Sequence, residues 1–249
     1  PCNIALMRQA QSVKKGVRAN GGTPREFCTI TVTDGIAMGH EGMKASLISR
    51  EVIADSAELT VRGHCYDALV GIAGCDKSLP ALMMSMVRLN VPSVFIYGGS
   101  ILPGRYKGKD VTVVDVFEAV GKHSSGKMSA AELRKLELVA CPSAGACGGQ
   151  FTANTMACVS EAIGLALPYS AGTPAPYEER DKYAKESGKT VMNLLAKKIK
   201  PRDIVTKKAL ENAATIVAAT GGSTNAALHL PAIANEAGIK FDLMDVAKI

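Results

Sequence analysis

The stretch that decides the fold runs Leu69-Val70-Gly71-Ile72-Ala73-Gly74-Cys75-Asp76-Lys77-Ser78-Leu79-Pro80. Its apolar first half is typical of a buried strand and ends at a glycine. Ser78 and Pro80 then suit the N-cap and the first turn of a helix. A strand followed directly by a helix is the unit of parallel α/β sheets, which bind ligands beyond the carboxyl ends of their strands. The stretch therefore predicts an α/β fold whose first turn presents a thiol, a carboxylate and an amine, at Cys75, Asp76 and Lys77.

Two other segments are expected to join the same sheet. Residues 27–33 are rich in β-branched side chains and end at Asp34, and residues 93–97 form a third short apolar run. Alternation of strands with helices predicts a three-layer α/β/α domain with a mainly parallel sheet. Because the carboxyl ends of parallel strands share one edge, Asp34 is expected beside the Cys75-Asp76-Lys77 turn. The helices of this part are predicted at residues 43–61 and 79–89.

Beyond residue 110 the chain is predicted to be mostly helical, with no internal repeat and no flexible linker. Residues 1–249 are therefore expected to form one domain, whose C-terminal half extends the α/β layers with helices. The sequence begins at Pro1 without a methionine and ends inside a helix expected after Asp242, so a longer polypeptide is expected. The helices of this half are predicted at residues 113–121, 129–139, 152–167, 178–200, 206–219 and 225–237.

The composition argues against several classes of protein. With 249 residues, 47% hydrophobic and 21% charged, the chain has the composition of a soluble globular protein. No apolar run approaches the ~18 residues that span a bilayer, and no signal peptide is visible, so no membrane partner is expected. Aromatic residues make up only 4% and Trp is absent, which argues against nucleic acid as a partner. The net charge of +6 arises largely from lysines in residues 182–208, which are expected on solvated helix faces.

The seven cysteines do not form a disulfide framework, because they are odd in number and widely scattered. A reducing compartment is expected, either the cytoplasm or, in a eukaryote, an organelle. Cys2 carries little information by itself at a chain end. Four others flank or interrupt apolar segments and are interpreted as core residues. These four are Cys28, Cys65, Cys141 and Cys158.

Several polar and glycine-rich loops have more than one interpretation. The loop Gly145-Ala146-Cys147-Gly148-Gly149-Gln150 either aims backbone amides at a thiolate, which would lower its pKa, or is a tight turn around a small cysteine. Gly221-Gly222-Ser223-Thr224-Asn225 either binds an anion or caps a helix. His40 either contacts substrate or caps the next helix. Residues 121–128 resemble a phosphate-binding loop, but Met128 replaces the metal-binding hydroxyl and no strand precedes them, so they are expected to separate two helices.

Together these segments resemble the N-terminal domain of the dihydroxy-acid and phosphogluconate dehydratase family. The similar stretches follow the order of the family and span nearly the whole chain. The Ala-Cys-Gly-Gly form around Cys147 resembles the branched-chain dihydroxy-acid members more than the sugar-acid members. The stretches are Pro1-Cys2-Asn3, residues 33–43, Gly74-Cys75-Asp76-Lys77, residues 145–156 and Gly221-Gly222-Ser223-Thr224-Asn225.

The resemblance implies two metal groups and a division of labour. One is an iron–sulfur cluster, for which three cysteines suit either type and the resemblance favours [2Fe–2S] over [4Fe–4S]. The other is Mg²⁺, bound in part by a lysine carbamate formed with carbon dioxide. The remaining magnesium ligand, a glutamate, and the catalytic serine base are implied in a C-terminal domain absent from this sequence, so the chain alone is expected to be inactive. The implied cluster ligands are Cys2, Cys75 and Cys147, and the implied magnesium ligands are Asp34, Asp76 and Lys77.

The function implied is that of a homodimeric hydro-lyase. It would dehydrate 2,3-dihydroxy carboxylic acids, such as 2,3-dihydroxyisovalerate, to 2-keto acids in valine and isoleucine biosynthesis. One alternative is a sugar-acid or 6-phosphogluconate dehydratase with the same metals. Another is a non-catalytic iron–sulfur or structural zinc protein, for which three cysteines are too few for a four-thiolate site.

Overall fold

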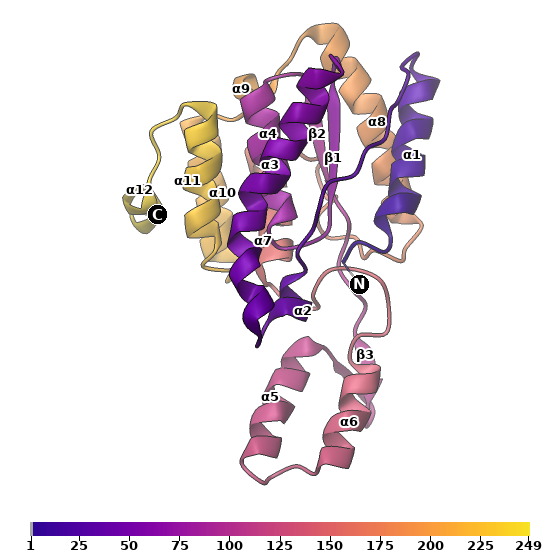
Figure 1. Ribbon diagram of the computed structural model, residues 1–249, viewed down its shortest axis with the longest axis vertical. Coiled ribbons are helices and arrows are strands. Elements are labelled where there is room, and N and C mark those ends of the chain that lie inside the picture. Colours follow the sequence, from indigo (N-terminus) through magenta and orange to yellow (C-terminus); the bar gives the residue numbers. More distant parts are fainter. Residues whose placement is uncertain (1) are drawn as a thin grey trace.

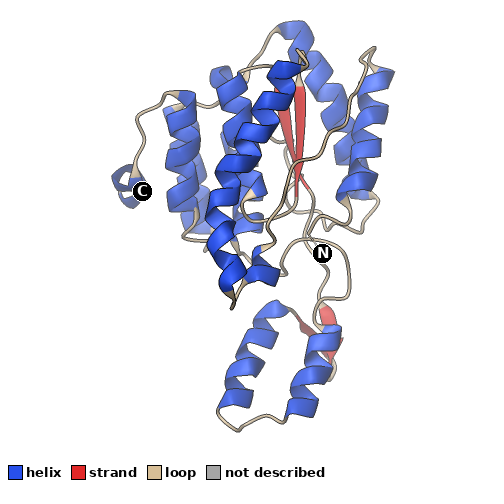
Figure 2. Cartoon of the chain, viewed as in Figure 1, coloured by secondary structure: helices blue, strands red, loops and turns tan. Residues whose placement is uncertain are grey.

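The computed structural model describes residues 2–249, so that Pro1 of the Pro1-Cys2-Asn3 segment lies outside the described residues. Helices dominate, and two small sheets accompany them (Figures 1 and 2). The strands are β1 (Leu69–Ala73), β2 (Ser93–Tyr97), β3 (Gly104–Tyr106) and β4 (Lys109–Val111). The helices are α1 (Leu6–Ala19), α2 (Asp34–Ala37), η1 (Glu41–Ala45), α3 (Ser46–Gly63), α4 (Ser78–Leu89), α5 (Val113–Ser124), α6 (Ala130–Val139), α7 (Thr152–Ile163), α8 (Glu179–Lys197), α9 (Pro201–Ile204), α10 (Lys207–Ala219), α11 (Ala226–Ala237) and α12 (Leu243–Ala247).

The predicted α/β unit is confirmed by a parallel pair of strands. β1 and β2 run in register from Leu69 opposite Ser93 to Ala73 opposite Tyr97, and α4 connects them. Side chains alternate across the sheet, so that Val94 and Ile96 pack on the side of α1 and α8, whereas Phe95 and Tyr97 pack in the larger core with α4 and α7. Helices therefore cover both faces of this small sheet (Figure 1).

The prediction of a third strand at residues 27–33 is wrong. This segment runs without regular structure, Ile30 is 53% exposed, and Thr29 shares a hydrogen bond with Ser56 of α3. β-branched residues favour strands only where a neighbouring strand pairs with them. Here the segment lies against a helix, which offers no backbone ladder.

An N-terminal helix that the sequence analysis did not predict, α1, packs along α8. The two helices lie so close at Gly16 that a Cβ atom there would stand 2.0 Å from the carbonyl oxygen of Lys185. Gln9 of α1 donates a hydrogen bond of 2.7 Å to the carbonyl oxygen of Gly98, just beyond β2. The packing of α1 on α8 and the hydrogen bond of Gln9 together fix the segment that follows Cys2.

The helices predicted after residue 110 are confirmed, although α7 and α8 end a few residues earlier than expected. α5 and α6 project from the α/β body with the β3–β4 hairpin, which was not predicted (Figure 2). They enclose a small core that includes Val111, Ala119 and Leu136. Residues 121–128 separate the two helices, as expected, and Ser129 caps α6. Among residues 2–249 no helix is both long and apolar enough to cross a membrane.

The assignment of four cysteines to the core is wrong for three of them. Cys28, Cys65 and Cys141 are exposed, and Cys158 is partly buried. Cys65 stands in a left-handed turn after α3, with φ of 53°, and Cys141 lies in the loop after α6. Neighbouring apolar residues therefore did not indicate burial at these chain reversals.

Candidate metal centre

Asp34, Asp76 and Lys77 form a buried group that we call the lysine–carboxylate cluster. Lys77 Nζ lies 2.8 Å from Asp34 Oδ2 and 2.6 Å from Asp76 Oδ1. Asp34 begins α2, whereas Asp76 and Lys77 occupy the turn between β1 and α4. Asp34 is 6% and Lys77 5% exposed. The predicted proximity of Asp34 to the turn is thus confirmed, although no strand delivers it.

The charges of this cluster balance one another only in part. Burial lowers the pKa of the Lys77 amine, but hydrogen bonds and charge interactions with Asp34 and Asp76 outweigh it, so the pKa is raised. Burial raises the pKa of the Asp76 carboxyl, and Lys77 opposes this shift. Ser46 donates a hydrogen bond of 2.8 Å to Asp34 Oδ1. Burial alone therefore does not make the Lys77 amine neutral here.

Cys2, Cys75 and Cys147 form a second group, the thiol cluster. The hydrogen bond from Cys2 lowers the pKa of Cys75 to about 7, helped by the backbone amides of Asp34 and Asp76. The same hydrogen bond, with burial, raises the pKa of Cys2. The contact therefore favours the thiol form of Cys2 and the thiolate form of Cys75. Cys147 interacts electrostatically with both.

One interpretation of the glycine-rich loop, that it lowers the pKa of Cys147, is wrong. Burial raises this pKa, and the neighbouring Cys75 raises it further. The loop is docked beside the continuation of β2, because Ala146 donates to the carbonyl oxygen of Gly99 at 2.9 Å and accepts from Ile101 at 2.7 Å. Backbone pairing at Ala146 therefore holds the N-terminal side of the Cys147 loop.

Close backbone contact also fixes the N-terminal segment. A Cβ atom at Gly74 would stand 2.3 Å from the carbonyl oxygen of Cys2. Only glycine allows the segment to lie this close to the end of β1. The glycine that ends the strand in the sequence therefore also admits Cys2 to the site.

The sequence analysis missed a polar residue that joins the motifs. Thr152, at the start of α7, faces Asp76 and lowers the pKa of its carboxyl, against the raising effect of burial. Its Oγ1 lies 3.0 Å from Ser223 Oγ and accepts a hydrogen bond of 2.8 Å from Asn225. Ser223 and Asn225 thus dock the loop between α10 and α11 onto α7. Thr152 lies in a stretch that carried the family resemblance, which was the available signal.

The interpretation of His40 as a capping residue is confirmed. His40 Nδ1 accepts a hydrogen bond of 3.0 Å from the backbone amide of Gly42 at the start of η1. Its side chain is therefore committed to the local turn.

Within residues 2–249, no three His, Cys, Asp or Glu side chains are arranged as a ready group for one metal ion. In the lysine–carboxylate cluster the third member is an amine, which binds no cation while it is an ammonium.

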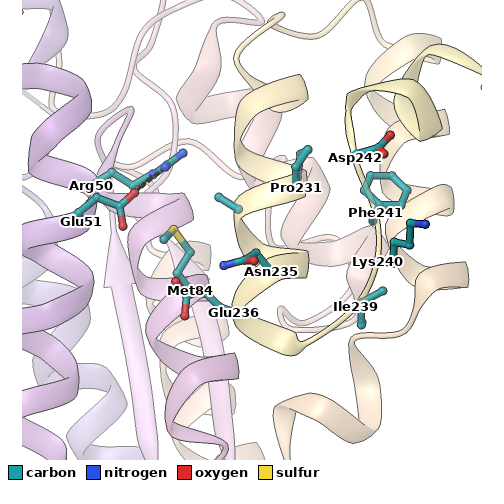
Figure 3. A pocket seen from close by; sticks show the side chains of 11 residues that line it. Arg50, Glu51, Met84, Pro231, Asn235, Glu236, Ile239, Lys240, Phe241 and Asp242 are labelled. Atoms are coloured by element: carbon teal, nitrogen blue, oxygen red, sulfur yellow. Dashed lines mark hydrogen bonds and ion pairs between the residues drawn. The ribbon is translucent and has the colours of Figure 1, made fainter.

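A cavity of about 580 Å³ lies apart from both clusters, between α3, α4 and α11 (Figure 3). Arg50 and Met84 line it, with residues 239–242 on the opposite side. Arg50 also donates to Nδ1 of the buried His229 at 3.1 Å. Burial, followed by the charges of Arg50 and Lys77, lowers the pKa of His229 to about 3, so this imidazole is neutral.

The chain is thus an α/β domain in which carboxylate, amine and thiol side chains gather at the carboxyl end of a parallel strand, β1. Residues 1–249 match the family model described as dihydroxy-acid/6-phosphogluconate dehydratase N-terminal. The chain belongs to this family and corresponds to its N-terminal part.

The similar proteins carry one name. The chain is 94% identical over 249 residues to the dihydroxy-acid dehydratase of Pelagibacter ubique, 82% identical to that of Parvibaculum lavamentivorans and 56% identical to that of Sulfurisphaera tokodaii. Each alignment covers the whole chain but only 44%, 43% and 44% of these relatives, respectively. The chain thus spans less than half the length of the curated relatives that it matches.

Proposed function

We propose that the protein carrying this chain is a hydro-lyase that dehydrates 2,3-dihydroxy carboxylic acids, such as 2,3-dihydroxyisovalerate, to 2-keto acids in valine and isoleucine biosynthesis. One observation carries the proposal. Asp34, Cys75 and Lys77 meet at one buried turn in a chain 94% identical to a protein named dihydroxy-acid dehydratase. A carboxylate, a thiolate and an amine at one strand end suit a centre with two kinds of metal.

The thiol cluster fits an iron–sulfur cluster, and [2Fe–2S] is favoured. Cys2, Cys75 and Cys147 would hold it. The observation that supports this fit is geometric: Cys2 and Cys75 are buried, and the close approach at Gly74 brings the backbone of Cys2 to the turn that carries Cys75. Thiolates are the ligand form, so iron binding would displace the thiol protons that the raised pKa values of Cys2 and Cys147 favour. Three thiolates leave one iron position open to substrate.

The lysine–carboxylate cluster fits Mg²⁺ once the amine has changed its charge. Asp34 and Asp76 supply hard oxygen ligands, but an ammonium between them repels a cation. The Lys77 ammonium first releases one proton, and the neutral amine then adds to carbon dioxide, forming an N–C bond and releasing a second proton, which leaves an anionic carbamate. The carbamate then contributes a third oxygen ligand where the ammonium had paired with the carboxylates.

The reaction removes a proton from the carbon beside the carboxylate and hydroxide from the next carbon, and the resulting enol becomes the 2-keto acid. When bound, the two metal groups supply Lewis acidity to the carboxylate and hydroxyl oxygens of the substrate. Ser46 holds Asp34 in place by a hydrogen bond, and Lys77 lies against both Asp34 and Asp76. The resemblance assigns proton removal to a serine outside residues 1–249, so the part of this chain is ligand binding and charge stabilisation.

The test compares substrates on the full-length protein after anaerobic preparation. We expect turnover of dihydroxyisovalerate, with iron and acid-labile sulfide in the protein and a [2Fe–2S] spectrum. Preference for sugar acids or 6-phosphogluconate would transfer the proposal to the other members of the family. Zinc without sulfide would overturn it.

The carbamate is tested separately by Lys77→Arg. A guanidinium cannot be carbamylated and stays positive, so loss of bound magnesium and of activity is expected. Labelling with ¹³C-bicarbonate should give a carbamate carbon signal in wild type that is absent from Lys77→Arg. If Lys77 only forms the observed ion pairs, the arginine variant keeps its activity and its magnesium dependence, and the carbamate proposal falls.

The assembly and location follow from the resemblance. The protein is proposed to act as a homodimer in the cytoplasm. Light scattering on the full-length protein should give twice the chain mass, and cell fractionation should recover it with the cytoplasmic proteins. A monomer, or recovery with membranes, would contradict this part of the proposal.

A further inference from the structure

Asn154, in the first turn of α7, uses its whole side-chain amide on the loop that carries Cys147. Its Nδ2 donates to the carbonyl oxygen of Cys147 at 2.7 Å and also to that of Gly149. Its Oδ1 accepts a hydrogen bond from the hydroxyl of Tyr97. Both amide hydrogens and the amide oxygen thus have partners, and the loop between the two carbonyls curves around one side chain.

This orientation of the amide is the only one compatible with its neighbours. Two carbonyl oxygens can only accept, so the NH₂ group must face Cys147 and Gly149. The reversed amide would place its oxygen against both carbonyls. Asn154 therefore fixes the direction of the peptides on both sides of the loop, and with them the position of Cys147.

Tyr97 anchors this arrangement to the sheet. It is the last residue of β2 and is 1% exposed. The guanidinium carbon of Arg180 lies 5.7 Å from the centre of its ring, and Arg180 Nη1 donates to the Tyr97 carbonyl oxygen at 3.0 Å. A buried side chain held at both ends is a rigid support for Asn154.

We infer that Asn154 is a positioning residue for Cys147, anchored by Tyr97, and that it sets the direction in which the loop presents its thiolate to the iron–sulfur cluster. This inference rests on the proposed function only for the identity of the bound group. The claim about the loop concerns the chain itself, so it is testable without any metal.

The first experiment uses the full-length protein after removal of its metals. We would measure the alkylation rate at each cysteine by peptide mapping in Asn154→Ala and in Asn154→Asp, which has the same shape but faces both carbonyls with oxygen. Loss of two ordinary hydrogen bonds should raise the rate at Cys147 by about tenfold. The rates at the buried Cys2 and Cys75 should not change. Gln150→Ala is the matched control, since Gln150 lies in the same loop and donates to Thr220.

The outcomes of this experiment are distinct. A rise confined to Cys147 in both Asn154 variants supports the inference. A rate equal to that of Gln150→Ala overturns it. A uniform rise at every cysteine would assign Asn154 to the stability of the whole chain and would also overturn it.

The second experiment uses the loaded protein and reads the cluster spectrum and the half-life of the cluster in air. We expect Asn154→Ala to shift the spectrum and shorten the half-life severalfold, Tyr97→Phe to have a smaller effect in the same direction, and Gln150→Ala to match wild type. A wild-type protein without iron and sulfide would overturn the proposed function and leave the alkylation result standing. A loaded wild type with unaltered Asn154 variants would overturn this inference alone.

Discussion

The lysine–carboxylate cluster and the thiol cluster share the turn after β1 but are stabilised in different ways. In the first, one ammonium lies 2.6 and 2.8 Å from two carboxylates and balances their charge in part. In the second, like groups meet, and the pKa values of Cys2 and Cys147 are raised. Loss of Lys77 would therefore leave two uncompensated carboxylates in the first cluster, whereas the second is held in place by loop geometry.

The largest effect is expected in the iron and sulfide contents of variants of the thiol cluster. We predict that Cys75→Ser and Cys147→Ser each abolish binding of the iron–sulfur cluster in the full-length protein, because a serine hydroxyl is a poor replacement for a thiolate. Iron and sulfide analysis gives the measurement. Cys28→Ser and Cys158→Ser are the controls and should keep normal contents. Normal iron in either Cys75→Ser or Cys147→Ser would refute the assignment.

The lysine–carboxylate cluster should respond in stability instead. Lys77→Ala leaves Asp34 and Asp76 buried without a counter-charge, so the free energy of unfolding should fall by about 3–5 kcal/mol in denaturant titrations. The exposed pair of Lys44 and Glu41 provides the control, and Lys44→Ala should change nothing measurable.

The pH dependence of that loss gives a second check. Without the ammonium, the already raised pKa of Asp76 rises further above its value in the unfolded chain. An acid with a raised folded-state pKa loses stability as the pH rises through that pKa. The deficit of Lys77→Ala should therefore be smaller at pH 5 than at pH 8. A deficit that grows on acidification would contradict this account.

A smaller loss of stability is expected from a change at Gly74, where close backbone contact holds the N-terminal segment of the thiol cluster. Gly74→Ala would place a Cβ atom 2.3 Å from the Cys2 carbonyl oxygen, so the N-terminal segment must move. We expect destabilisation by about 1–3 kcal/mol in thermal unfolding, with faster alkylation of Cys2. Gly63→Ala at the end of α3 meets no atom within 4 Å and should be neutral or slightly stabilising. Equal effects of the two variants would remove Gly74 from the site.

The smallest effect is expected in the pH at which Cys75 of the thiol cluster ionises. In metal-free protein, the ultraviolet thiolate absorbance should show a step near pH 7 that is missing from Cys75→Ser, because the pKa of Cys75 is about 7. In Cys2→Ala the step should move to higher pH, since the hydrogen bond that lowers this pKa is lost. The exposed Cys65 is the control position, and Cys65→Ser should retain the step. If the absorbance step of Cys2→Ala stays at the pH seen in wild type, Cys2 does not lower the pKa of Cys75, and this account is contradicted.

The parts of the fold predicted correctly are those whose signals are local. The helices of the C-terminal half have apolar spacing and end signals within their own sequence, and the turn at Cys75 combines a strand end with a helix start. Residues 27–33 have an equally clear β-branched pattern, but pairing depends on a partner strand that the pattern cannot supply. Neighbouring sequence likewise failed for Cys65, because a chain reversal carried it to the surface.

The candidate site could be predicted in part for the same reason. Asp76 and Lys77 are adjacent in sequence, so their proximity needed no fold. The predicted position of Asp34 is correct although the strand expected to deliver it is absent. Instead, α2 begins at Asp34 and brings it to the same edge. The partners of Asn154 are 7 and 57 residues away in sequence and are joined by hydrogen bonds, which leave no periodic pattern.

The pairing of α1 with α8 sets the order of events during synthesis. The helix that follows Cys2 packs on residues 179–197, which are translated long after it. At about 5–20 residues per second, roughly ten to forty seconds pass before that partner has been made. The thiol cluster therefore cannot assemble as the chain emerges, and its first cysteine waits unplaced until α8 has been translated. Any iron–sulfur cluster that these thiols bind would therefore be inserted only after α8 has been translated.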